Sequence, residues 1–78
     1  MELKELVEVI AKALVDEPDT VDVKEVDGDK STVIELRVST KCLGNIIGKK
    51  GRNIQSIRTI VNAAAAKLNK RVMLDVIE

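Results

Sequence analysis

Apolar and polar residues alternate with two different periods along the first half of the chain. Between residues 3 and 14 the apolar side chains follow i, i+3, i+4, i+7 and i+11 spacing, which predicts a helix that ends before Pro18. From Val21 apolar and polar residues alternate singly, and the alternation resumes over 32–38 after the turn signal Asp27-Gly28-Asp29. This pattern predicts two strands that pair as an antiparallel hairpin.

The second half of the chain predicts two more helices and one more strand. Ser39 or Thr40 can cap a short helix over about 41–47. A long helix is expected over about 52–68, where the apolar residues fall within one sector about 100° wide. Single alternation returns over 71–77, which predicts a final strand.

The predicted order of elements is therefore α-β-β-α-α-β. Three amphipathic helices and a three-stranded sheet with one apolar face form a two-layer α+β domain, in which the helices cover one face of the sheet. No linker, repeat or low-complexity segment divides the sequence, so residues 1–78 are expected to form a single small domain.

The composition narrows the chemistry that the chain can perform. It has no His and one cysteine, Cys42, so the sequence offers no metal-ligand cluster and no nucleophile beside a visible base. We expect no enzyme activity, no metal, no cofactor and no small-molecule substrate. Cys42 is interpreted as a small buried apolar residue of a cytoplasmic protein. The acidic N-terminal segment is unlike a signal peptide, and no stretch approaches the about 18 apolar residues of a membrane span, so no membrane association is expected.

Charge is distributed unevenly although the formal net charge is zero. Residues 1–39 carry 5 Lys or Arg and 11 Asp or Glu, whereas residues 40–78 carry 8 Lys or Arg and 2 Asp or Glu. No acidic residue lies between Lys41 and Arg71. The asymmetry favours either a polyanionic partner for the basic half or a dipole whose halves pair with each other, and charge alone does not separate the two.

The most distinctive stretch is residues 46–57, IIGKKGRNIQSI. Two glycines enclose two lysines between the expected helices. The short loop therefore combines a flexible backbone with the unpaired N–H groups of a helix start and with two ammonium groups. Such a loop can bind a phosphate, but Gly-Lys-Lys-Gly alone is also typical of an ordinary basic turn. The chain has no Phe, Tyr or Trp, which excludes RNA-binding mechanisms that stack bases on aromatic rings.

Residues 46–57 resemble the KH-domain signature I-I-G-x-x-G-x-x-I-x-x-I, and the order α-β-β-α-α-β matches the type II KH topology. The resemblance covers essentially the whole chain. The runs IRTIVNAAAAK and KRVMLDVIE also look like the KhpA (YlqC-like) family of small bacterial stand-alone KH-domain RNA-binding proteins. The resemblance implies a single-stranded RNA-binding protein, an RNA chaperone or post-transcriptional regulator with a role in cell-shape and cell-wall control. The alternative is a KH-fold protein–protein interaction module that does not bind nucleic acid.

The resemblance also implies site residues. The GxxG loop would clamp the backbone of about four nucleotides, and the isoleucines beside it would line an apolar groove for the bases. Asn45 and Gln55 are weaker candidates for polar contacts. The residues assigned to RNA binding are Gly48, Lys49, Lys50, Gly51, Arg52, Ile47 and Ile54. The choice of RNA over single-stranded DNA rests on the resemblance, because a backbone clamp alone does not read the 2′-hydroxyl.

Ile60 and Ala63 lie to one side of the apolar stripe of the long helix. Ile60 is about 90° from the centre of that stripe, so it is either a residue at the edge of the core or a contact in a homodimer. The resemblance implies self-association and pairing with a larger KH-containing protein, KhpB. A second linked clamp would strengthen RNA binding through effective concentration.

Overall fold

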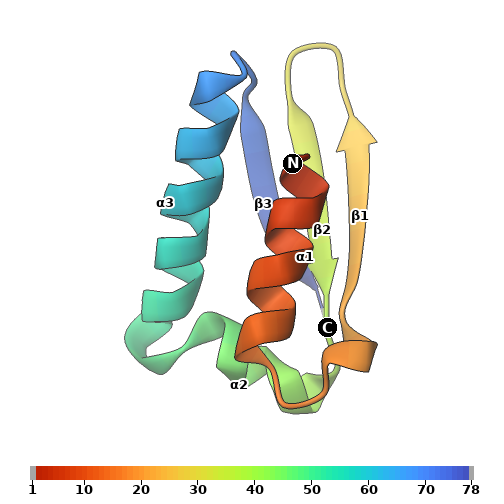
Figure 1. Ribbon diagram of the computed structural model, residues 1–78, viewed down its shortest axis with the longest axis vertical. Coiled ribbons are helices and arrows are strands. Elements are labelled where there is room, and N and C mark those ends of the chain that lie inside the picture. Colours follow the sequence, from red (N-terminus) through yellow and green to blue (C-terminus); the bar gives the residue numbers. More distant parts are fainter. Residues whose placement is uncertain (1, 78) are drawn as a thin grey trace.

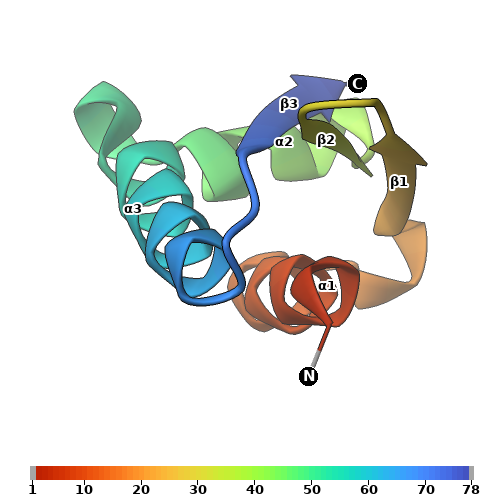
Figure 2. The same cartoon turned by 90° about the horizontal axis from the view of Figure 1, so that it is seen from above.

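The computed structural model describes residues 2–77 and arranges them in two layers, helices on one side and a sheet on the other (Figure 1 and Figure 2). Three α-helices and three strands follow the expected order, which confirms the predicted α+β architecture. The helices are α1 (Leu3–Leu14), α2 (Thr40–Ile47) and α3 (Arg52–Lys67), and the strands are β1 (Asp22–Asp27), β2 (Thr32–Arg37) and β3 (Val72–Ile77). Within the described residues, no helix has both the length and the hydropathy needed to cross a membrane.

The sheet has the order β1-β2-β3, with β2 at its centre. β1 and β2 pair antiparallel as the predicted hairpin, whereas β3 pairs parallel with β2. A parallel pair needs a long crossover connection, and α2 and α3 provide it. Val23 lies opposite Leu36, and Ile34 lies opposite Leu74, so the buried side chains of the three strands form one apolar face. α1 and α3 cover this face, and α2 lies at one end of the sheet (Figure 1 and Figure 2).

The core is aliphatic, as the composition requires. Its largest fully buried side chains are Ile34, Leu36, Ile46, Val7, Val38, Val61 and Cys42. Cys42 is 1% exposed, which confirms its interpretation as a buried apolar residue. Leu68 was expected in the buried stripe of α3 but is 51% exposed, because α3 ends at Lys67 and Leu68 occupies the C-cap position.

The start of α2 differs from the expectation. Ser39 occupies the N-cap position with extended backbone, but its side chain makes no capping hydrogen bond, so the predicted hydroxyl cap is wrong. The backbone carbonyl of Ser39 instead accepts the N–H groups of Cys42 and Leu43, which begins the helix. The Ser39 hydroxyl lies beside the Cys42 thiol and lowers the pKa of that thiol.

Candidate nucleic-acid interface

The loop Gly48–Gly51 lies at the end of the molecule where α2 leads into α3 (Figure 1). Backbone hydrogen bonds close the loop, and one of them runs from the N–H of Arg52 to the carbonyl of Lys49. The N–H of Gly48 donates to the carbonyl of Gly44 at 2.9 Å, and the N–H of Gly51 donates to the carbonyl of Gly48 at 3.1 Å. Lys49–Gly51 thereby form a single 3-10 turn, η2, directly before Arg52 begins α3. The loop is a tight turn tied to α2, so its backbone is fixed before any ligand arrives.

The loop backbone lies largely in the left-handed half of conformational space. Gly48 has φ 75° and ψ 173°, a combination that is essentially restricted to glycine. Gly51 has φ 73° and ψ 16° and sits at the N-cap of α3. Lys50 has φ 59° and ψ 24°, which costs a residue with a Cβ about 1–2 kcal/mol. A lysine therefore occupies a position at which glycine would be less strained.

The cations of the loop are free for an external anion. Lys49, Lys50 and Arg52 are all exposed. Within residues 2–77 the one ion pair joins Lys12 to Glu8 on α1, so none of the three has a carboxylate partner there. A phosphate would therefore not have to displace a carboxylate of residues 2–77 from these three cations.

Asn53 fixes the loop from the first turn of α3. Its amide nitrogen Nδ2 donates to the carbonyl of Asn45, near the end of α2, at 2.8 Å. A Cβ on Gly48 would lie 2.6 Å from Cγ of Asn53, so the asparagine side chain fills the space beside that glycine. The sequence pattern does not indicate this role of Asn53, because a single amide on a helix carries no periodic signal.

The expected groove residues differ in how much surface they expose. Ile47 is half-buried and packs against the edge of the core. Ile54 is only 7% exposed, and its Cγ2 would lie 3.9 Å from a Cβ on Gly51. Ile54 thus supports the loop from beneath and leaves little surface for a base, whereas Ile47 retains some. Of the weaker candidates, Gln55 is exposed, while Oδ1 of Asn45 is buried.

α3 is joined to the free edge of β3 by Arg58. The carbonyls of Arg71 and Ile77 accept the N–H groups of Thr32 and Val38, so in β3 the odd-numbered carbonyls face β2 and the even-numbered ones face outward. Nη2 of Arg58 donates to the outward carbonyl of Leu74 at 3.2 Å. The border between α3 and β3 therefore carries a cation at its middle, a feature that the sequence alone did not predict.

Ile60 and Ala63 lie on the outer surface of α3. Ile60 is 48% exposed and Ala63 is also exposed. Ile60 lies at one end of a shallow hollow of about 460 Å³ whose other residues are polar. The lining residues are Arg52, Gln55, Ser56, Thr59 and Ile60. A large apolar side chain here contributes little to the core of a single chain.

The α-β-β-α-α-β order, the mixed sheet and a GxxG loop between two helices together define a type II KH domain. The chain belongs to the KhpA/KhpB KH-domain family, whose sequence model matches residues 4–76. RNA-binding protein KhpA of Clostridium perfringens is 53% identical over 75 residues, which are 96% of this chain and 100% of that protein. RNA-binding protein KhpA of Caldanaerobacter subterraneus is 55% identical over 73 residues, which are 94% of this chain and 97% of that protein.

Solved structures of Era carry the same fold. Era in complex with MgGDPNP and nucleotides 1506–1542 of 16S ribosomal RNA superposes with a TM-score of 0.62 at 29% identity. Aquifex aeolicus Era bound to GDP.AlF4- superposes with a TM-score of 0.64 at 28% identity. Each match covers 95% of this chain, but the chain spans only 28% and 29% of the two Era chains.

Proposed function

We propose that this protein binds single-stranded RNA by clamping its phosphate backbone at the Gly48–Gly51 loop. The observation that carries the proposal is the juxtaposition of a fixed, left-handed glycine turn with two exposed lysines that have no carboxylate partner within residues 2–77. The names of the KhpA relatives and the RNA in the Era complex support RNA as the polyanion.

The proposed clamp acts in two ways. The ammonium groups of Lys49 and Lys50 offer hydrogen bonds and charge to phosphate oxygens, and the positive end of the α3 dipole adds to the attraction. The N–H groups of Gly51 and Arg52 are already paired with the carbonyls of Gly48 and Lys49. Gly51 has no side chain between the loop backbone and the nucleic acid, which permits close approach, whereas the space beside Gly48 is filled by Asn53. The bases then lie toward Ile47 and the α3–β3 border, with Arg52 and Gln55 as polar contacts. A clamp without aromatic stacking predicts modest affinity and loose sequence preference.

The decisive test compares RNA binding by the wild type and by Lys49→Asp/Lys50→Asp. Aspartate is chosen because it tolerates the left-handed backbone at residue 50 better than most residues. The matched control is Lys4→Glu/Lys12→Glu at exposed positions of α1, outside the loop, which changes the net charge by the same amount. Because it also removes the Lys12–Glu8 ion pair, its fold is checked in the same way.

We expect the loop variant to keep its circular dichroism spectrum and to lose most RNA binding, while the control loses little. For the wild type, log K should fall against log salt with a slope of roughly −2 to −3, about 0.7 for each of a few gripped phosphates. Unchanged binding by the loop variant would favour the alternative, a protein–protein interaction module. Single-stranded DNA of the same sequence tests whether the 2′-hydroxyl is read.

We further propose that the protein is a cytoplasmic RNA chaperone or post-transcriptional regulator that works as a homodimer or with a larger KhpB-type protein. Membership of a family that spans KhpA and KhpB supports such pairing, and the exposed Ile60 and Ala63 supply a candidate contact. The proposed role in cell shape and cell-wall control rests on the resemblance to KhpA. Complementation of a deletion strain by the wild type, but not by the loop variant, would link that role to RNA binding; complementation by both would separate them.

A further inference from the structure

The face of the sheet that points away from α1 and α3 carries an ordered pattern of side chains (Figure 2). Because Val23, Ile34 and Leu74 are buried on the helix side, the residues that alternate with them along each strand point to the open face. The strand register places these outward residues in three rows across the sheet. The rows are Asp22, Arg37 and Ile77; Lys24, Glu35 and Asp75; and Val26, Val33 and Met73.

The charged residues of the β1–β2 hairpin on this face form cross-strand pairs of opposite sign. Asp22 lies opposite Arg37, and Lys24 lies opposite Glu35. The four side chains line a shallow hollow of about 210 Å³. None of them forms an ion pair with another residue among 2–77. Their charges therefore remain available to a second molecule that packs on this face.

The third row of the open face is apolar. Val26 is 46% exposed and Met73 is 58% exposed, and Val33 lies half-buried between them. Single exposed apolar side chains are common on protein surfaces, whereas three in neighbouring positions across a sheet form a patch that a partner can cover.

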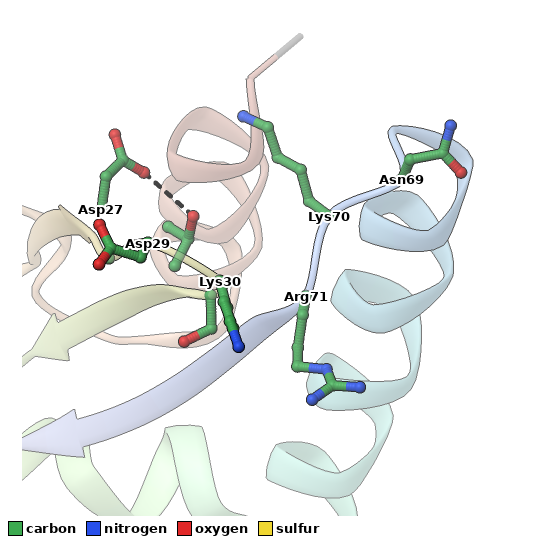
Figure 3. A pocket seen from close by; sticks show the side chains of 9 residues that line it. Asp27, Asp29, Lys30, Asn69, Lys70 and Arg71 are labelled. Carbon is green, nitrogen blue, oxygen red and sulfur yellow. Dashed lines mark hydrogen bonds between the residues drawn. The ribbon is translucent and has the colours of Figure 1, made fainter.

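The hairpin end of this face is fixed by hydrogen bonds. Oγ1 of Thr32 donates to Oδ1 of Asp27 at 3.0 Å (Figure 3). The N–H of Gly28 donates to the carbonyl of Ser31 at 2.7 Å, and the N–H of Thr32 donates to the carbonyl of Arg71 at 2.8 Å. The rows of side chains thus project from a rigid backbone, which lowers the entropy cost of binding.

We propose that a second copy of this chain packs face to face on the open side of the β1–β2 hairpin. The two-fold axis of this contact runs parallel to the strands and between β1 and β2. In a two-fold contact, residue i of one copy meets residue j of the other, and j meets i. A hairpin whose cross-strand pairs are of opposite charge, or both apolar, is then complementary to itself.

This symmetry pairs every residue of the hairpin rows favourably. Asp22 of one copy faces Arg37 of the other, Lys24 faces Glu35, and Val26 faces Val33, each pair occurring twice. Sheets that pack with their strands nearly aligned lie about 10 Å apart, which long charged side chains span. The formal net charge of zero adds no overall repulsion between copies.

The sheet contact is independent of the other proposed sites. It uses no residue of the Gly48–Gly51 loop, and Ile60 lies on α3 in the helical layer. Exposed ion pairs each contribute little, so we expect a Kd on the order of 0.1–1 mM. Chains held on one RNA reach effective concentrations of about this range, at which the contact would pack bound copies side by side.

The first test is sedimentation of the wild-type chain, without RNA, from about 0.02 to about 2 mM, a range that brackets the expected Kd. The average mass should rise across this range at low salt. It should rise less when the salt is increased about tenfold, because salt screens exposed charges. The variants Lys24→Glu and Glu35→Lys should each associate at least about tenfold more weakly, because each brings like charges together twice. Circular dichroism checks that both variants fold.

The second test mixes the two variants, since a two-fold contact predicts that each repairs the other. Glutamate at position 24 of one chain then meets lysine at position 35 of its partner, and the reverse pair is also of opposite charge. Fluorescently labelled Lys24→Glu should bind Glu35→Lys about fivefold or more tighter than it binds Glu5→Lys. Glu5→Lys is the matched control, because it has the same net charge but changes an exposed residue of α1. Asp22→Arg and Arg37→Asp give the same test on the other charge pair if one of the first variants does not fold.

Three results would overturn the inference. A wild-type mass that does not change with concentration would mean that this face does not bind a second copy and is left to a different partner or to solvent. Association of the single variants equal to that of the wild type would exclude the charge pairs. Equal binding of labelled Lys24→Glu to Glu35→Lys and to Glu5→Lys would mean that net charge alone attracts the chains.

Discussion

The side-chain amide of Asn53 donates a hydrogen bond of 2.8 Å to the backbone carbonyl of Asn45 and so connects α3 to α2 across the Gly48–Gly51 loop. The same side chain fills the space beside Gly48, where a Cβ would lie 2.6 Å from Cγ of Asn53. One residue therefore fixes both the ends and the interior of the turn. We regard Asn53 as a positioning residue, which holds the loop in the conformation that we propose binds a phosphate.

Replacing Asn53 by alanine should loosen the loop without unfolding the domain. The Asn45 carbonyl would lose its partner, and we expect the free energy of unfolding to fall by about 1–3 kcal/mol in urea denaturation. RNA affinity should fall as well, because an unfixed loop must be ordered on binding. Asn62→Ala, at an exposed position of the same helix, is the matched control. Equal stability and equal affinity of the two variants would show that the Asn53 hydrogen bond does not hold the loop.

The three glycines around the loop should respond very differently to substitution by alanine. Gly48→Ala combines a glycine-only backbone with contacts below 3 Å to Asn53, and we expect a loss of about 3 kcal/mol or more. Gly51→Ala meets no atom closer than 3.9 Å and should cost only about 1–2 kcal/mol for its left-handed φ. Gly44 is helical with open space around it, so Gly44→Ala should stabilise the protein by up to about 1 kcal/mol.

Thermal and urea unfolding of the three variants provide the measurement, with the wild type alongside. The order of stability should be Gly44→Ala, wild type, Gly51→Ala and then Gly48→Ala. If Gly48→Ala and Gly51→Ala lower the free energy of unfolding by similar amounts, the packing of Asn53 against Gly48 contributes nothing. Backbone conformation alone would then explain why glycine occupies both positions.

Arg58 occupies one outward carbonyl of the free edge of β3, and we expect it to protect that edge. The strand reads VMLDVI, with high β propensity and one charge, and such an edge promotes association when it is uncovered. We expect Arg58→Ala to lower the free energy of unfolding by about 0.5–1.5 kcal/mol through the lost bond to Leu74. It should also raise light scattering on heating, relative to Arg52→Ala, which removes an exposed side chain that makes no hydrogen bond to residues 2–77. Matching scattering in the two variants would argue against the protective role.

Local sequence patterns predicted the order of the elements and the position of the loop. Apolar residues recur about every 3.6 residues in the helices and every second residue in the strands, which distinguishes the two. Two glycines at fixed spacing mark the turn. The contacts that fix the site were not predictable in this way. Asn45 with Asn53, Arg58 with Leu74, and Thr32 with Arg71 each join residues from different elements, and they depend on three-dimensional packing. The expected cap by Ser39 failed for the same reason, because its hydroxyl lies beside the buried Cys42 thiol.

Ile60 provides the last prediction, which concerns self-association. Its side chain is 48% exposed on α3, so aspartate at this position should leave the core intact. If Ile60 lies at a homodimer contact, sedimentation should show a dimer for the wild type and a folded monomer for Ile60→Asp, because a buried unpaired carboxylate opposes association. Val9→Asp on α1, where the side chain is 57% exposed, is the control and should remain dimeric. A monomeric wild type, or loss of the folded state in Ile60→Asp alone, would refute the dimer contact. A dimer would also present two RNA clamps, so Ile60→Asp should weaken binding to long RNA more than to short RNA.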